Sequence, residues 1–129
     1  METLLDESSL GFLEKLPKEH QSIAKALLTG WQAGGGTVDA GKIAARLRAT
    51  RGGKTFTAGT LTADRLELSR VVLEANGMQP DDWIHWSDDL ADIPEFDQAA
   101  KYPVIPFPQP LPEVLRIAQD LRDLARKLE

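Results

Sequence analysis

The stretch that decides the fold is "GKIAARLRATRGGKTFTAGTL", residues 41–61. Its first half alternates apolar and polar residues, and its second half is rich in β-branched and aromatic residues, which favour strands. Gly52 and Gly53 separate the halves, and paired glycines admit the positive φ angles of a tight turn. The pattern predicts a β-hairpin within residues 37–61. On the first strand the inward residues would be Ile43, Ala45, Leu47 and Ala49. The outward residues would be Lys42, Ala44, Arg46 and Arg48.

The same stretch also admits a helix. Asp39 would cap it, and Ile43 and Leu47 are four residues apart, so they would share one side. This alternative would make the region a helix-turn-helix. Three glycines at positions 34–36 and a further glycine at position 41 weaken it, because glycine disfavours helix interiors. We therefore predict the hairpin, which a third strand could extend into a meander.

Composition predicts one globular domain covering residues 1–129. The chain is 42% hydrophobic and 27% charged, and its formal net charge is −5. It contains no cysteine, so disulfides and thiolate chemistry are excluded. Apolar runs never exceed three residues and the first ten residues are acidic, which predicts neither a membrane span nor a secretion signal. From these features we expect a cytoplasmic protein with no membrane partner.

Residues 64–76 are typical of a helix. Asp64 and Glu67 have capping-box spacing, and Gly77 could end the helix. However, Leu66 and Leu68 alternate with polar residues, as in a strand. A helix over the whole span is our prediction, and a strand that passes into a helix stays open as the alternative.

The remaining segments predict helices at both ends of the chain. Ser8 or Ser9 could cap a first helix, and Pro17 suits the first turn of a second. Residues 79–97 contain seven acids and no Lys or Arg, and they are typical of short helices. Five prolines between positions 103 and 112 predict an extended strap lying against the body. Residues 112–129 form an amphipathic helix, which completes a predicted α+β fold.

Three sets of residues are candidate binding surfaces. The cations of the hairpin could bind a protein partner or nucleic acid: Lys42, Arg46, Arg48, Arg51 and Lys54. The heptad-like seam of the last helix could pack in the core or mediate self-association: Val114, Ile117, Leu121, Leu124 and Leu128. Large aromatic side chains could help form that interface: Trp83, Trp86 and Phe107.

These surfaces favour a non-enzymatic protein-interaction module that associates with itself, as a homodimer for example. The first alternative is a nucleic-acid-binding protein that uses the basic hairpin. The second is a metal-dependent enzyme with ligands in the acidic segment, drawn from Asp81, Asp82, His85, Asp88, Asp89 and Asp92. Because these acids match no known ligand spacing, we assign no catalytic residue, cofactor or metal site.

Overall fold

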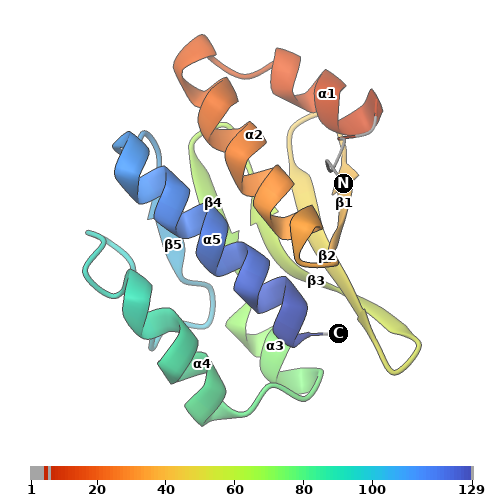
Figure 1. Cartoon of the computed structure of the whole chain (residues 1–129), viewed down its shortest axis with the longest axis vertical. Coiled ribbons are helices and arrows are strands. Elements are labelled where there is room, and N and C mark those ends of the chain that lie inside the picture. Colours follow the sequence, from red (N-terminus) through yellow and green to blue (C-terminus); the bar gives the residue numbers. More distant parts are fainter. Residues whose placement is uncertain (1–4, 6, 129) are drawn as a thin grey trace.

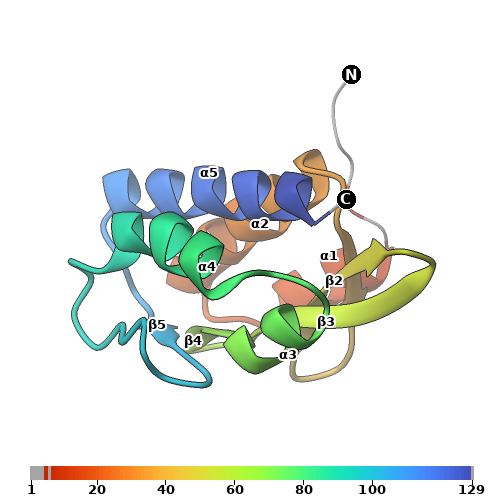
Figure 2. The ribbon, with the colours of Figure 1, turned by 90° about the horizontal axis from the view of Figure 1, so that it is seen from below.

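The computed structural model describes Leu5 and residues 7–128. It shows an α+β fold in which a five-stranded antiparallel sheet carries helices on one face (Figures 1 and 2). The strands are β1 (Thr37–Ala40), β2 (Ala45–Arg51), β3 (Lys54–Leu61), β4 (Arg65–Leu68) and β5 (Val104–Pro106). The helices are α1 (Glu7–Glu14), α2 (Lys18–Ala33), α3 (Arg70–Ala75), α4 (Pro80–Ser87), the 3₁₀ turn η1 (Asp88–Leu90) and α5 (Leu111–Lys127). The predicted fold class and the helices at both ends are confirmed.

The sheet is a meander in which each strand pairs with the next one along the chain, in the order β1-β2-β3-β4-β5. The predicted hairpin is β2–β3, and its turn contains Gly52 (φ 61°) and Gly53 (φ 80°). Residues other than glycine rarely adopt these angles, so the glycine pair sets the turn. The turn projects past the helices at one corner of the molecule (Figure 1).

The first hairpin strand begins later than the alternation predicts. Residues 41–44 form the turn between β1 and β2, which the N–H of Gly41 closes by donating to the carbonyl of Ala44 at 2.8 Å. Ile43 is therefore 84% exposed, and its predicted inward orientation is wrong. Lys42 lies in the same turn and not on the outward face of a strand. The other predicted inward residues are buried: Ala45, Leu47 and Ala49.

Residues 64–76 do not form one helix. They form β4, then α3 beginning at Arg70, so the continuous helix and its capping box are wrong and the strand-to-helix alternative is correct. Leu66 and Leu68 are fully buried on the same face of the sheet, an arrangement that the two-residue period of a strand provides. The N–H of Ser69 then donates to the carbonyl of Ala58 at 2.8 Å, which holds the start of α3 against β3.

The proline-rich strap is extended, as predicted, and it also completes the sheet. Ile105 pairs with Leu66 and is fully buried. The N–H of Leu68 donates to the backbone carbonyl of Pro103 at 2.9 Å, and the N–H of Phe107 donates to the backbone carbonyl of Asp64 at 2.8 Å. Prolines are tolerated here because an edge strand pairs on one side only.

The helix layer is built on close packing between α2 and α5. A Cβ atom at Gly30 would lie 2.5 Å from the carbonyl oxygen of Ala118, so this contact requires glycine. Trp31 is fully buried, and its Nε1–H lies 3.0 Å from both the Thr37 and Arg48 carbonyl oxygens. The indole therefore ties α2 to the first two strands.

The apolar seam of α5 faces the core of its own chain. All five of its residues are buried: Val114, Ile117, Leu121, Leu124 and Leu128. The seam therefore has the packing role that the sequence allowed, and a second copy could reach it only if the helix layer opened. Among the described residues, no helix has the length and apolar character needed to cross a membrane.

Candidate functional site

The face of the sheet turned away from the helices is polar. Figure 2 shows α2, α4 and α5 on one side of the strands. We call the other side the open face and define it by the outward polar side chains of β1–β4. They are Thr37, Asp39, Arg46, Arg48, Thr50, Thr55, Thr57, Thr60, Arg65 and Glu67, and none of them is buried. A rigid sheet therefore presents these groups to solvent.

Asp39 lies beside two of the candidate cations. Its Oδ2 is 3.9 Å from Nη1 of Arg46 and 3.7 Å from Nη1 of Arg48. The three side chains are between 37% and 61% exposed, so water screens both ion pairs. Exposed pairs of this kind contribute about 0–1 kcal/mol to stability. Both guanidinium groups are therefore accessible to a further anion.

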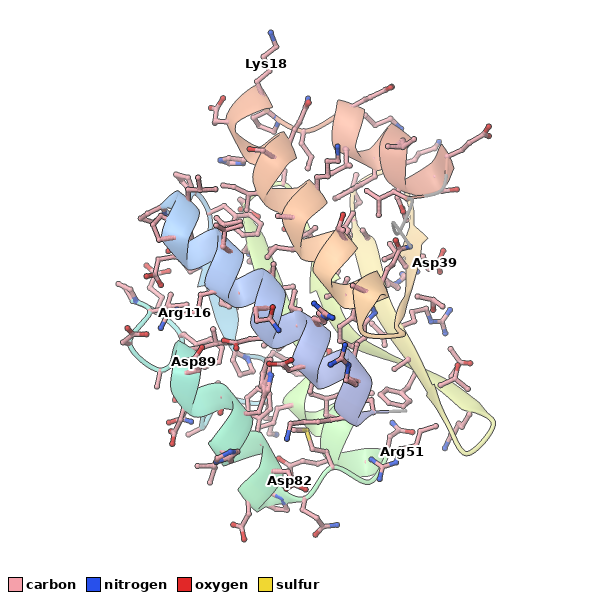
Figure 3. All side chains as sticks on the ribbon, viewed as in Figure 1. Lys18, Asp39, Arg51, Asp82, Asp89 and Arg116 are labelled. Carbon is pink, nitrogen blue, oxygen red and sulfur yellow. The ribbon has the colours of Figure 1, made fainter. Side chains whose placement is uncertain are left out.

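The five predicted cations do not form one surface. Arg46 and Arg48 lie on the open face, whereas Arg51 and Lys54 pair across the strands on the opposite side of the hairpin. The guanidinium of Arg51 borders a small cleft beside Gly77, away from Asp39 (Figure 3). Lys42 lies in the β1–β2 turn, at the other end of β2. The structure thus brings together two of the five.

No aromatic side chain lies on the open face, every residue of which the structure describes. Phe56, the one aromatic residue in the five strands, is buried on the helix side. Proteins that bind single-stranded nucleic acid use aromatic rings as stacking platforms. The open face therefore offers charge and hydroxyl groups without such a platform.

The predicted aromatic interface lies inside the fold. Trp83 and Trp86 are buried, and their ring centroids are 5.5 Å apart. Each indole N–H donates to a backbone carbonyl at 2.8 Å, that of Gln98 for Trp83 and that of Asp120 for Trp86. Phe107 is half-buried against the core. The two tryptophans thus fasten α4 to its neighbours and are not displayed to a partner.

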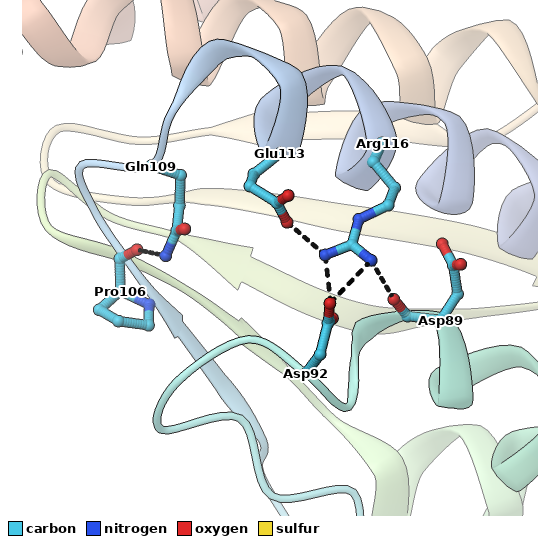
Figure 4. A network of polar contacts seen from close by, with 6 residues as sticks. All are labelled: Asp89, Asp92, Pro106, Gln109, Glu113 and Arg116. Carbon is cyan, nitrogen blue, oxygen red and sulfur yellow. Dashed lines mark hydrogen bonds and ion pairs between the residues drawn. The ribbon is translucent and has the colours of Figure 1, made fainter.

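Arg116 connects the acidic segment to α5 (Figure 4). Its guanidinium donates to the carbonyl of Asp89 at 2.8 Å, pairs with Asp92 at 3.0 Å and contacts Glu113. Two carboxylates and a carbonyl thus surround one cation. This network explains part of the acidic segment as structural, because it holds η1 against α5.

A cavity of about 460 Å³ lies between α4 and α5. Burial, a hydrogen bond with Asp89 and the charges of Asp89 and Asp123 raise the pKa of Asp120 to about 8, against the opposing charge of Arg116. His85, Arg126 and Lys127 also line the cavity. Asp120 was not among the residues predicted from the sequence. The sequence feature that could have identified it is the spacing of Arg116, Asp120 and Asp123, which places the three on one side of the last helix, facing the acidic segment.

Over the part of the chain that the structure describes, no three His, Cys, Asp or Glu side chains are arranged to hold a metal ion. The arrangement of the acidic residues in 81–97 therefore gives no geometric support to the hypothesis of a metal-dependent enzyme. Comparison of the chain with models of known protein families, with curated protein sequences and with solved structures found no match. The open face, with its two accessible arginines, is the candidate binding surface.

Proposed function

We propose that this protein is a non-enzymatic interaction module that binds an acidic surface of a partner protein through its open face. The observation that supports this most directly is the pair Arg46 and Arg48, which project from a central strand and share one exposed carboxylate, Asp39. We propose a cytoplasmic location as part of this function, since the chain contains no cysteine.

Two arginines on one strand suit recognition of carboxylates. A guanidinium group offers a planar fork of N–H donors that matches a carboxylate in a bidentate pair. The strand holds both groups at fixed positions, so little freedom is lost when a partner binds. A locally positive patch on a chain of net charge −5 would also orient an acidic partner during encounter.

The lack of an aromatic platform favours a protein partner over nucleic acid. Arg46 and Arg48 alone would neutralise few phosphates of a nucleic-acid backbone. Nucleic-acid binding is therefore an outcome that the experiment must distinguish.

The test measures binding of two fluorescent probes, a poly-glutamate peptide and a single-stranded oligonucleotide, by anisotropy at low and moderate salt. The Arg46→Ala/Arg48→Ala variant should lose about tenfold or more in affinity for the peptide. The matched control is Lys15→Ala/Lys18→Ala, which removes two exposed cations, one in the connection between α1 and α2 and one at the start of α2. Lys18 lies well away from Asp39 (Figure 3). Its affinity for the peptide should change little.

Three results would overturn the proposal. The wild-type protein could fail to bind the peptide at low salt. The two double variants could lose the same affinity, which would mean that only net charge matters. Salt-dependent binding of the oligonucleotide alone would favour the nucleic-acid alternative.

A further inference from the structure

The outer side of the helix layer carries an apolar groove between α2 and α5. The groove has a volume of about 480 Å³. Ala26 and Gly30 of α2 line it together with Ala118 of α5, so its floor is shallow and lies close to both backbones. Leu115 forms part of the wall and is 58% exposed. An apolar side chain from another molecule could therefore pack against Leu115 and the alanines.

Positive charge borders this groove. Lys25 lies on α2 and Arg122 on α5, and none of the groove's ten lining residues is acidic, although the chain has 20 acids and 15 bases. The Nε of Arg122 is buried and makes no hydrogen bond within the described part of the chain. The groove therefore suits an occupant that combines an apolar side chain with flanking carboxylates.

Helix α4 presents that combination on its outer side. Ile84 is 51% exposed, Asp81 lies three residues before it, and Asp88, the first residue of η1, lies four after it. At this spacing the three residues share one face. The inner side of the helix is occupied by the buried tryptophans described above. No Lys or Arg occurs between positions 80 and 90. The outer side of α4 and the start of η1 thus present one apolar side chain, Ile84, between the carboxylates of Asp81 and Asp88.

The charge spacings on the two surfaces are comparable, differing by about 3 Å along the helix axes. Gly30 packs on Ala118 and Gly34 on Arg122, so α2 and α5 run parallel and Arg122 is level with Gly34. Lys25 is nine residues before Gly34, which places the two cations about 13 Å apart along the helix axes at 1.5 Å per residue. Asp81 and Asp88 are about 10 Å apart by the same rise.

We propose that the occupant is α4 of a second copy of this chain. Ile84 of one copy packs against Leu115 and Ala118 of the next, while its flanking acids approach Lys25 and Arg122. A symmetric contact between two grooves would bring like charges together, which disfavours it. The contact therefore joins two unlike surfaces, and it builds a reciprocal pair, a ring or an open chain of copies.

This proposal is independent of the binding function proposed above, because no open-face residue lines the groove. Helix α4 has only eight residues, so the contact is small and belongs to the weak, transient class of interfaces. We expect a dissociation constant on the order of 100 µM, weakened by salt because the flanking charges are exposed.

The test is sedimentation velocity over a concentration series that reaches several times that value. Ile84→Glu removes the apolar contact of α4, and Leu115→Glu places an acid in the groove; both positions are exposed, so folding should be retained. Each variant alone should be monomeric. An equimolar mixture should form a 1:1 dimer that grows no further, because the intact α4 of one variant docks in the intact groove of the other.

The matched control is Leu111→Glu. Leu111 is 68% exposed on the same helix but does not line the groove, so this variant should associate as the wild type does. A wild-type protein that is monomeric throughout the series would overturn the proposal. The proposal would also be overturned if the wild type associates and either single variant still associates. It would be overturned as well if the mixture of the two variants stays monomeric.

Discussion

Neighbouring residues of β2 and β3 point to opposite faces of one sheet, and the two faces differ in chemistry. On the covered face, Leu47 and Phe56 are buried beneath the helices. On the open face, Arg46 and Arg48 are exposed and share Asp39. One alternating strand thus supplies both the core and the proposed binding surface, so substitutions one residue apart should have separable effects.

The largest effect on stability should come from the covered face. Leu47→Ala leaves a cavity in the core beneath the helix layer and should lower the free energy of unfolding by about 2–5 kcal/mol. Its matched control is the adjacent Arg46→Ala, which should change that free energy by less than about 0.5 kcal/mol. Urea unfolding followed by circular dichroism measures both. Equal destabilisation by the two variants would contradict the separation of the faces.

A second test contrasts the cavity carboxyl of Asp120 with carboxylates on the surface. Its pKa of about 8 lies above the value of 3.8 for an unperturbed aspartate, so the folded state keeps a proton that the unfolded chain has released. The free energy of unfolding should therefore fall as the pH rises from about 4 to about 8. Asp120→Asn should flatten this fall, as measured by urea unfolding at several pH values.

The exposed Asp82→Asn is the matched control for this prediction and should keep the pH dependence of the wild type. If Asp120→Asn kept the full slope, the carboxyl would not hold its proton in the folded state.

The turn that joins the two strands should show a smaller effect. Gly53 has a φ of 80° and open space around the position of a Cβ atom, so only the backbone conformation opposes substitution. Gly53→Ala should cost about 1 kcal/mol of unfolding free energy. Thermal unfolding measures it, with Gly11→Ala as a control, because Gly11 lies in α1 and also has open space around it. A neutral Gly53→Ala would indicate that the turn does not need its positive φ.

The smallest effect on stability should come from Asp39. Asp39→Ala breaks two exposed ion pairs and should change the free energy of unfolding by less than about 0.5 kcal/mol. Binding of the poly-glutamate probe should strengthen, because Arg46 and Arg48 no longer share an internal carboxylate. Weaker binding in this variant would mean that Asp39 orients the arginines and does not compete for them.

Local patterns in the sequence predicted the parts of the fold that depend on local chemistry. Alternation and the glycine pair predicted β2 and β3, and the apolar seam predicted α5. The strand β4 was predicted only as the alternative to a continuous helix over residues 64–76. The strand β5 was not predicted as part of the sheet, because its evidence is pairing with distant residues, such as Ile105 with Leu66. Pro103 and Pro106 also concealed β5, since prolines in a strand become acceptable only at the edge of a sheet.

The candidate site could be predicted only in part for a related reason. The sequence identified the cations, and Arg46 and Arg48 were correctly placed outward from a strand. The same alternation places Arg51 on the side of Leu47 and Ala49, which the prediction did not take into account. That Lys42 lies in a turn depends on the connection between β1 and β2, which the alternation does not reveal. The aromatic residues and the apolar seam were identified as packing surfaces, but the sequence did not specify whether they pack within the chain or between copies.

The most direct test of the open face is a titration of isotope-labelled protein with the poly-glutamate peptide, followed by amide chemical shifts. We expect the shifts to concentrate on β2 and its neighbours β1 and β3, around Arg46 and Arg48, and to leave α2 and α5 unchanged. Shifts that cluster on the helix layer, or none at saturating peptide, would contradict this expectation.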